Sequence, residues 1–122
     1  MAKILIVDDD IQTTTLLESL ITMNGHQPTS VNLSRNAIKE ASTLSPDLIL
    51  LDIMMEGVNG IELCKLIKAD SSLKNVPVIM VSALDDLGSK RDSFNAGAVD
   101  FITKPVRPHD FAHRIQGALI NK

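Results

Sequence analysis

Short apolar runs alternate along the chain with longer segments in which apolar residues recur at helical spacing. Four runs contain few or no polar residues, at 4–7, 48–51, 78–81 and 99–103. Apolar runs without strict alternation are typical of strands buried on both faces, as in a parallel sheet. A weaker strand is predicted at 27–31, where Pro28 favours an edge position because proline donates no ladder hydrogen bond.

The longer segments predict five helices. Asn59 and Pro108 are typical of helix starts, whereas Gly25 and Gly97 are typical of positions just past a helix end. The predicted apolar faces are Leu16, Leu17, Leu20 and Ile21; Leu33, Ala37, Ala41 and Leu44 in a helix over 32–44; Ile61, Leu63, Leu66 and Ile67; Leu87 and Phe94; and Phe111, Ile115 and Leu119. Such strand–helix units predict a parallel α/β sheet with helices on both faces.

Polar residues directly follow four of the predicted strands. They are Asp8 and Asp9, Asp52, Ser82 and Lys104. The carboxyl ends of parallel strands meet at one edge of the sheet, where doubly wound folds have their functional crevice. Packing does not require these residue types, since any turn residue would end a strand. We therefore predict a functional site at this edge.

Three carboxylates at one edge indicate a divalent cation. Two like charges about 4 Å apart repel by roughly 4 kcal/mol at an effective dielectric constant near 20, unless a cation compensates them. Oxygen ligands without His or Cys suit Mg²⁺, or Mn²⁺ as an alternative. A solvated acidic turn is the competing interpretation.

Composition narrows the class of protein. The net charge is -3 and the three Phe residues are the only aromatic ones, so neither a basic nucleic-acid surface nor a base-stacking platform is predicted. The single cysteine, Cys64, lies among apolar residues and is interpreted as a core residue. Without a secretory signal or an apolar run of roughly 20 residues, we expect a cytoplasmic protein that does not cross a membrane. No repeat or linker divides the chain, so one domain over 1–122 is predicted.

Five short motifs occur in a particular order: VDDD at 7–10, LLD at 50–52, Gly60, SA at 82–83 and DFITKP at 100–105. Together they resemble the receiver domains of bacterial two-component response regulators, and the resemblance covers essentially the whole chain. It implies a flavodoxin-like (βα)5 fold with sheet order 2-1-3-4-5.

The resemblance also implies a phosphoacceptor site. Asp52 would accept a phosphoryl group from a histidine kinase or a histidine phosphotransfer protein. Mg²⁺ would be surrounded by Asp8, Asp9, Asp52 and the backbone carbonyl of Met54. Such a domain would catalyse only its own phosphorylation and slow dephosphorylation, so it would not be a conventional enzyme.

Three further residues would belong to the switch. By the resemblance, Lys104 would neutralise the phosphoryl group and Ser82 would donate a hydrogen bond to it. Phe101 would change rotamer and alter the surface of the fourth helix, fifth strand and fifth helix. That surface would regulate an output domain or partner, and a homodimer through the fourth and fifth helices is a further expectation.

Several residues have simpler interpretations. Lys104 could be a counter-ion of the acids, Phe101 an ordinary core residue and Ser82 an ordinary strand end. His109 and His113 lie one helical turn apart and could bind a metal, yet the sequence indicates no third ligand.

The chain departs from the family pattern at several positions. Glu56 replaces a proline common in the loop after the acceptor, and Arg107 precedes Pro108 where an N-capping Ser is common. Met54 and Leu84, two residues after Asp52 and Ser82, would flank the path of the hydrolytic water. Because both are apolar, we predict a phosphoryl group that is lost slowly.

Three other classes remain open at this point. An aspartate-nucleophile phosphatase usually has a second Asp where this chain has Met54. A flavin electron carrier would need a Ser-, Thr- or Gly-rich loop where this chain has Asp8 and Asp9. A pseudo-receiver normally lacks part of the acidic set. A stand-alone receiver and one cut from a larger regulator would look alike in this sequence.

Overall fold

Five parallel strands form one sheet in the computed structural model, which describes residues 1–120. The strands are β1 (Lys3–Val7), β2 (Gln27–Val31), β3 (Leu48–Leu51), β4 (Val78–Ser82) and β5 (Asp100–Thr103). Their order is β2-β1-β3-β4-β5, and every neighbouring pair is parallel. The predicted flavodoxin-like order is confirmed, and Pro28 lies on an edge strand as expected.

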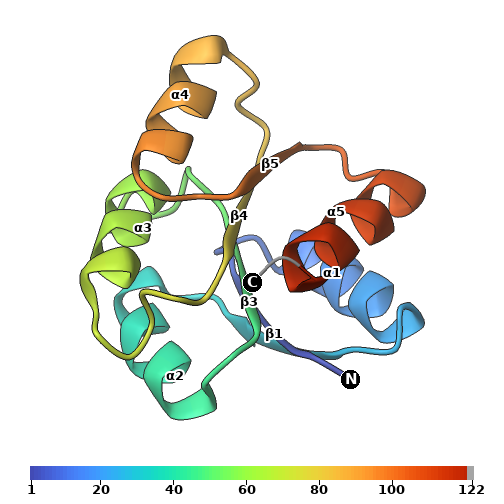
Figure 1. Ribbon diagram of the computed structural model, residues 1–122. Helices are drawn as coiled ribbons and strands as arrows, with labels where there is room; N and C mark the ends of the chain where they lie inside the picture. Colours follow the sequence, from blue (N-terminus) through green and yellow to red (C-terminus); the bar gives the residue numbers. More distant parts are fainter. Residues whose placement is uncertain (121–122) are drawn as a thin grey trace.

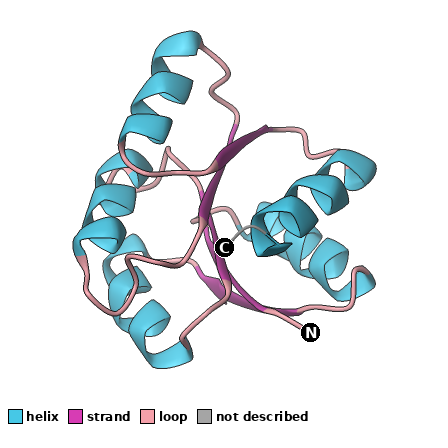
Figure 2. Cartoon of the chain, viewed as in Figure 1, coloured by secondary structure: helices cyan, strands magenta, loops and turns pink. Residues whose placement is uncertain are grey.

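The helices cover both faces of the sheet. They are α1 (Ile11–Met23), α2 (Ala37–Leu44), α3 (Gly60–Ala69), α4 (Leu87–Asn95) and α5 (Pro108–Ile120). Helices α1 and α5 lie on one face, and α2, α3 and α4 lie on the other (Figure 1). The strands therefore form the middle of three layers, as the colouring by secondary structure shows (Figure 2).

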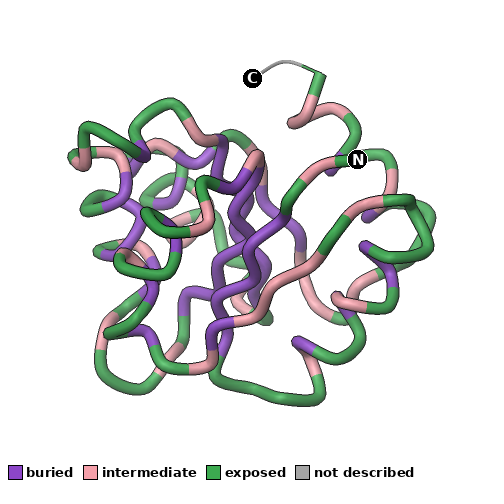
Figure 3. Tube along the Cα trace, turned by 90° about the horizontal axis from the view of Figure 1, so that it is seen from below, coloured by how far each residue is buried: buried purple, intermediate pink, exposed green. Residues whose placement is uncertain are grey.

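Two apolar clusters hold the layers together. Along β1, Ile4 and Ile6 belong to the cluster that includes α1 and α5, whereas Leu5 and Val7 belong to the cluster on the opposite face. This alternation follows from the period of two in a strand. Both faces are covered, so the central strands are buried along their length (Figure 3), and no side chain of β3 or β4 is exposed. Cys64 is fully buried in the second cluster, as predicted.

The helix predicted over 32–44 is shorter than expected. A 3₁₀ turn occupies Ser34–Asn36, and α2 begins only at Ala37. Leu33 has an extended backbone and is 51% exposed, so it does not belong to an apolar helical face. Asn32 donates to the carbonyl of Asp8 and Ser34 donates to the carbonyl of Glu56. These tertiary hydrogen bonds hold the segment outside the helix.

One residue of the apolar face predicted for α1 is not buried. The difference between Leu16 and Leu17 allows a matched test. Leu17 is 1% exposed, whereas its neighbour Leu16 is 45% exposed. We expect Leu17→Ala to lower the free energy of unfolding by about 3 kcal/mol, because it removes buried methyl groups and leaves a cavity. Leu16→Ala should lower it by less than about 1 kcal/mol. Urea denaturation of both variants measures the difference, and equal losses would contradict the assigned register of α1.

Candidate functional site

The sheet backbone positions the site residues. Beyond the strand ends, the N–H of Asp8 donates to the carbonyl of Val31 (3.1 Å), and the N–H of Asp52 donates to the carbonyl of Val7 (3.0 Å). After β5, the N–H of Lys104 likewise donates to the carbonyl of Ser82 (2.9 Å). Parallel pairing thus continues for one residue past β1, β3 and β5. Because these backbone positions are fixed, the three side chains meet in one place.

Lys104 contacts both buried acids. Its Nζ lies 3.0 Å from Oδ2 of Asp8 and 3.4 Å from Oδ2 of Asp52. The side chains of Asp8, Asp52 and Lys104 are 2%, 7% and 20% exposed. A buried carboxylate is costly unless it is paired, so this ammonium group is the principal compensation for the two acids in the protein itself.

Asp9 completes the acidic cluster from the exposed side. Asp8, Asp9 and Asp52 each offer a carboxylate oxygen, and these oxygens lie within 4.8 Å of one another. The Oδ2 of Asp9 accepts a hydrogen bond from the backbone N–H of Glu56 (2.8 Å). The three acids predicted from the strand ends are therefore together, with oxygen donors of the kind that suit a hard divalent cation.

Asp10, the last acid of the VDDD motif, has a different environment. It is the N-cap of α1, where its carboxylate accepts from the N–H of Gln12 (3.1 Å) and from the hydroxyl of Thr13 (2.7 Å). Its own N–H donates to Oδ1 of Asp8 (2.9 Å). Asp10 thus starts the helix and orients Asp8, in keeping with the preference for Asp at N-caps.

Burial and neighbouring charges together shift the pKa values of Asp52 and Lys104. Desolvation, reinforced by the charge of Asp8, raises the pKa of Asp52 although Lys104 opposes the change. Desolvation acts to lower the pKa of Lys104, but its hydrogen bond to Asp8 and the charges of Asp52 and Asp8 outweigh burial and raise it. Lys104 therefore remains a cation at neutral pH. Asp52 is the carboxylate whose charged form the folded protein disfavours.

Two predicted switch residues are buried in the neighbouring strands β4 and β5. Ser82 is 1% exposed, and its Oγ accepts a hydrogen bond from the N–H of Leu84 (3.2 Å). Phe101 is 6% exposed and belongs to the apolar cluster on the face of α2, α3 and α4. The ammonium of Lys90 on α4 lies 5.8 Å from the centroid of its ring, within the range of a cation–π contact.

Met54 and Leu84 differ in exposure. Met54 is 63% exposed, whereas Leu84 is partly buried against the core. Neither side chain carries a group that could activate water.

Gly60 allows the start of α3 to pack closely against the backbone of Asp52, which its place in a motif did not reveal. A Cβ at Gly60 would lie 1.9 Å from the carbonyl oxygen of Asp52 and 2.8 Å from the Cα of Ile53. Its N–H donates to the carbonyl of Ile53 (2.8 Å), and the preceding Asn59 caps α3 as predicted by accepting from the N–H of Ile61. Only glycine lets the start of α3 approach the backbone of Asp52 so closely.

The histidines do not form a second metal site. His26, His109 and His113 line one pocket, so the fold does bring a third imidazole toward the predicted pair. Yet within residues 1–120 the acidic cluster is the only group of three or more such side chains with ligand atoms close enough to share an ion.

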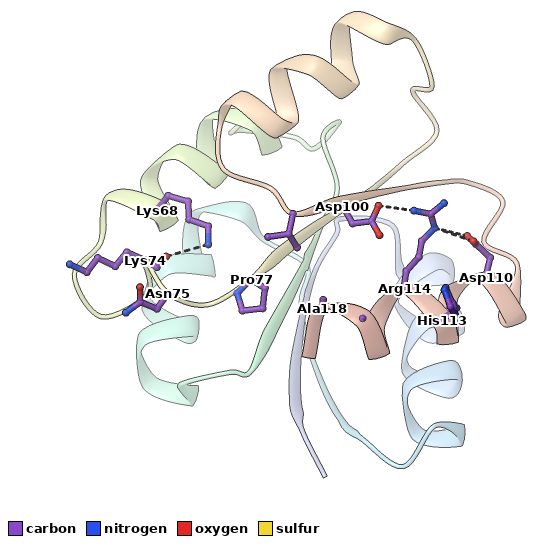
Figure 4. Close-up of a pocket in the computed structure, with 11 residues that line it drawn as sticks. Lys68, Lys74, Asn75, Pro77, Asp100, Asp110, His113, Arg114 and Ala118 are labelled. Atoms are coloured by element: carbon purple, nitrogen blue, oxygen red, sulfur yellow. Dashed lines mark hydrogen bonds and ion pairs between the residues drawn. The ribbon is translucent and has the colours of Figure 1, made fainter. Parts of the chain in front are cut away.

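A separate pocket of about 690 Å³ lies at the amino ends of β4 and β5, beside Pro77, Val99 and Asp100 (Figure 4). The guanidinium of Arg114 pairs there with Asp100 (2.6 Å) and Asp110 (3.0 Å). The ammonium of Lys68 donates to backbone carbonyls of the loop before β4. Because this pocket lies at the opposite ends of the strands from the acidic cluster, and because Arg114 is already paired with two acids, it is not the candidate site.

Comparison with known proteins shows the family of this chain. The family model of the response regulator receiver domain matches residues 4–116, so the chain belongs to this family. It is 36% identical to the response regulator PleD of Caulobacter vibrioides over 105 residues, covering 86% of the chain. It is 33% identical to the DNA-binding response regulator MtrA of Mycobacterium tuberculosis over 117 residues, covering 96% of the chain.

The fold comparison is equally close. The chemotaxis protein CheY4 of Vibrio cholerae superposes with a TM-score of 0.92 at 26% identity, covering 98% of this chain and 99% of that one. The matched regions make up 23% of PleD and 50% of MtrA, so this chain spans only part of the length of these relatives. Receiver domains are signalling domains rather than conventional enzymes. Among residues 1–120, no helix combines the length and apolar character needed to cross a membrane.

The raised pKa of Asp52 predicts how its replacement changes stability. A raised folded-state pKa contributes stability below the ordinary Asp value of 3.8 that is lost as pH rises through the folded-state pKa. At pH 7 the charged carboxylate is therefore unfavourable. We expect Asp52→Asn to raise the free energy of unfolding by about 1 kcal/mol without divalent cations, because it removes the cost of burying a charge and then the repulsion from Asp8.

This advantage should shrink as pH falls toward 3.8. Asp70→Asn is the control, because a hydrogen bond from Ser72 lowers the pKa of that exposed acid, and its replacement should not stabilise the protein at pH 7. Denaturant unfolding across the pH range measures both variants. A less stable Asp52→Asn protein at pH 7 would contradict the electrostatic assignment.

Proposed function

We propose that residues 1–122 form one receiver domain that acts as a phosphorylation switch, with Asp52 as the phosphoacceptor beside Mg²⁺. The observation that carries the proposal is the pairing of Lys104 with both Asp8 and Asp52, next to Asp9. This arrangement places an ammonium group beside the buried carboxylate of Asp52, with the exposed carboxylate of Asp9 on its solvent side. Family membership supports the same function.

The donor set fits Mg²⁺, with Mn²⁺ as an alternative. Asp8, Asp9 and Asp52 supply carboxylate oxygens within 4.8 Å of one another, and we propose that the backbone carbonyl of Met54 supplies another ligand. When bound, the cation would offset the acidic charge and attract phosphate oxygens.

The chain's own residues account for the transfer step. A carboxylate oxygen of Asp52 would form a bond to phosphorus while the P–N bond of a donor phosphohistidine breaks, its electron pair remaining on the imidazole. Lys104 would neutralise charge on the phosphoryl oxygens. The oxygen of Ser82 already accepts from the N–H of Leu84, so its hydroxyl hydrogen is free to donate to a phosphoryl oxygen. The donor would be a histidine kinase or a histidine phosphotransfer protein.

A conformational change at the site would be transmitted to the surface by Phe101. Its ring is buried beneath Lys90 of α4, so movement of Ser82 toward a phosphoryl group would free space for a change of rotamer. We propose that the surface formed by α4, β5 and α5 then changes and regulates an output domain or a partner. A homodimer through α4 and α5 is one form that this regulation would take.

Intact-mass measurement after incubation with acetyl phosphate and Mg²⁺ tests the phosphoacceptor. We expect the wild-type protein to gain the mass of one phosphoryl group, and Asp52→Ala to gain none because the nucleophile is missing. Glu62→Gln removes an exposed acid of α3 and should be phosphorylated like the wild type. Labelling of Asp52→Ala, or labelling that is unaffected by a chelator, would contradict the proposal.

The apolar pair Met54 and Leu84 predicts slow loss of the phosphoryl group. Without a side chain to orient water, we expect the phosphorylated protein to have a half-life longer than about one minute with Mg²⁺ present, because a positioned base contributes about 10²-fold or more. Met54→Gln, which adds a hydrogen-bonding group at an exposed position, should shorten the half-life, whereas Met54→Leu should not. Intact-mass measurements over time follow the loss of the phosphoryl group from each variant. A wild-type half-life below about a minute would refute the prediction.

A further inference from the structure

The loop after Asp52 is joined to Asp9 by its backbone. The N–H of Glu56 donates to Oδ2 of Asp9 at 2.8 Å, across 47 residues of sequence. Asp9 is the exposed member of the acidic cluster, whereas Asp8 and Asp52 are buried. An exposed carboxylate on a flexible side chain needs an added contact to keep one orientation, and hydrogen bonds from N–H groups to carboxylates are among the stronger ones in proteins.

The loop at Glu56 is itself held by Ser34, on the carbonyl side of the residue. The hydroxyl of Ser34 donates to the carbonyl of Glu56 (3.1 Å) and accepts from the N–H of Val58 (3.3 Å). Ser34 is 7% exposed, so water competes little for these bonds. Between them lies Gly57 with a φ of +97°, where a Cβ would lie 3.2 Å from the Ser34 oxygen. The backbone of Glu56 is therefore held on both sides of the residue, by Asp9 at its N–H and by Ser34 at its carbonyl.

We infer that the backbone N–H of Glu56 is a positioning group for the metal, which orients Asp9 as a ligand, and that Ser34 holds this N–H in place. The inference rests on the metal site of the proposed function. Only main-chain atoms of Glu56 take part, so any residue other than proline would supply the N–H. Hydrogen bonds to metal ligands typically change metal affinity by about tenfold to a hundredfold.

Two substitutions at Glu56 separate the N–H from the side chain. Glu56→Ala keeps the N–H, and its affinity for Mg²⁺ should stay within about twofold of the wild type. Glu56→Pro removes the N–H and should weaken Mg²⁺ binding by about tenfold. Calorimetric titration with Mg²⁺ measures the affinities, and ¹⁵N–¹H amide spectra establish that each variant is folded. Equal or tighter binding by a folded Glu56→Pro protein would overturn the inference.

Ser34→Ala provides a second test that leaves both Asp9 and Glu56 unchanged. It removes the bridging hydroxyl, so we expect several-fold weaker Mg²⁺ binding and, without metal, faster hydrogen exchange at the Glu56 amide. This test also decides the matter if Glu56→Pro does not fold. Unchanged affinity together with unchanged exchange in Ser34→Ala would overturn the role of Ser34.

The wild-type titration distinguishes the two levels of the proposal. If wild-type protein binds Mg²⁺ and the Glu56 and Ser34 variants bind it equally well, only the positioning role is wrong. If wild-type protein binds no Mg²⁺, the metal site of the proposed function fails and the positioning role fails with it.

Discussion

The contacts of one ammonium group with two carboxylates are the constraint on which the site depends. Lys104 follows β5, Asp8 follows β1 and Asp52 follows β3, and the lysine Nζ lies within 3.4 Å of both acids. Without this cation, two buried carboxylates would face each other in a medium that screens charge poorly. The arrangement exists only if the parallel pairing of the sheet is maintained to the ends of the strands, so the integrity of the fold and the chemistry of the site are linked.

Lys104 compensates the charge of the acidic cluster only in part, and this suits the proposed metal site. Asp52 keeps a raised pKa because burial and Asp8 outweigh the lysine. Its charge is therefore favoured less in the folded protein than in water, and a cation bound beside this carboxylate would offset that cost. A site with fully compensated charges would gain less from metal binding. In the pocket that contains Arg114, by contrast, the guanidinium is already paired with two acids.

Loops between the strands and helices hold the surroundings of the acidic cluster. Gly60 brings the start of α3 against the backbone of Asp52, where a Cβ would lie 1.9 Å from the Asp52 carbonyl oxygen. Glu56 contacts Asp9 through its N–H, and Ser34 holds the same loop from the 3₁₀ turn before α2. Gly60 thus lies against the backbone of Asp52, whereas the loop that contains Glu56 is held by side-chain contacts with Asp9 and Ser34. The start of α3 is therefore the helix end that lies directly against the Asp52 backbone.

The sequence by itself determined the strand–helix alternation, the edge position of β2 and the convergence of Asp8, Asp9, Asp52 and Lys104, because these follow from local periodicity and from parallel pairing. Tertiary structure alone decided how these groups pair. Lys104 reaches Asp8 across 96 residues, and Glu56 reaches Asp9 across 47. It also decided that Leu33 lies outside a helix and that Leu16 is exposed, because helical spacing does not reveal which contacts neighbouring segments offer. Bonds between distant segments depend on the packed arrangement of loops, for which no local pattern provides a signal.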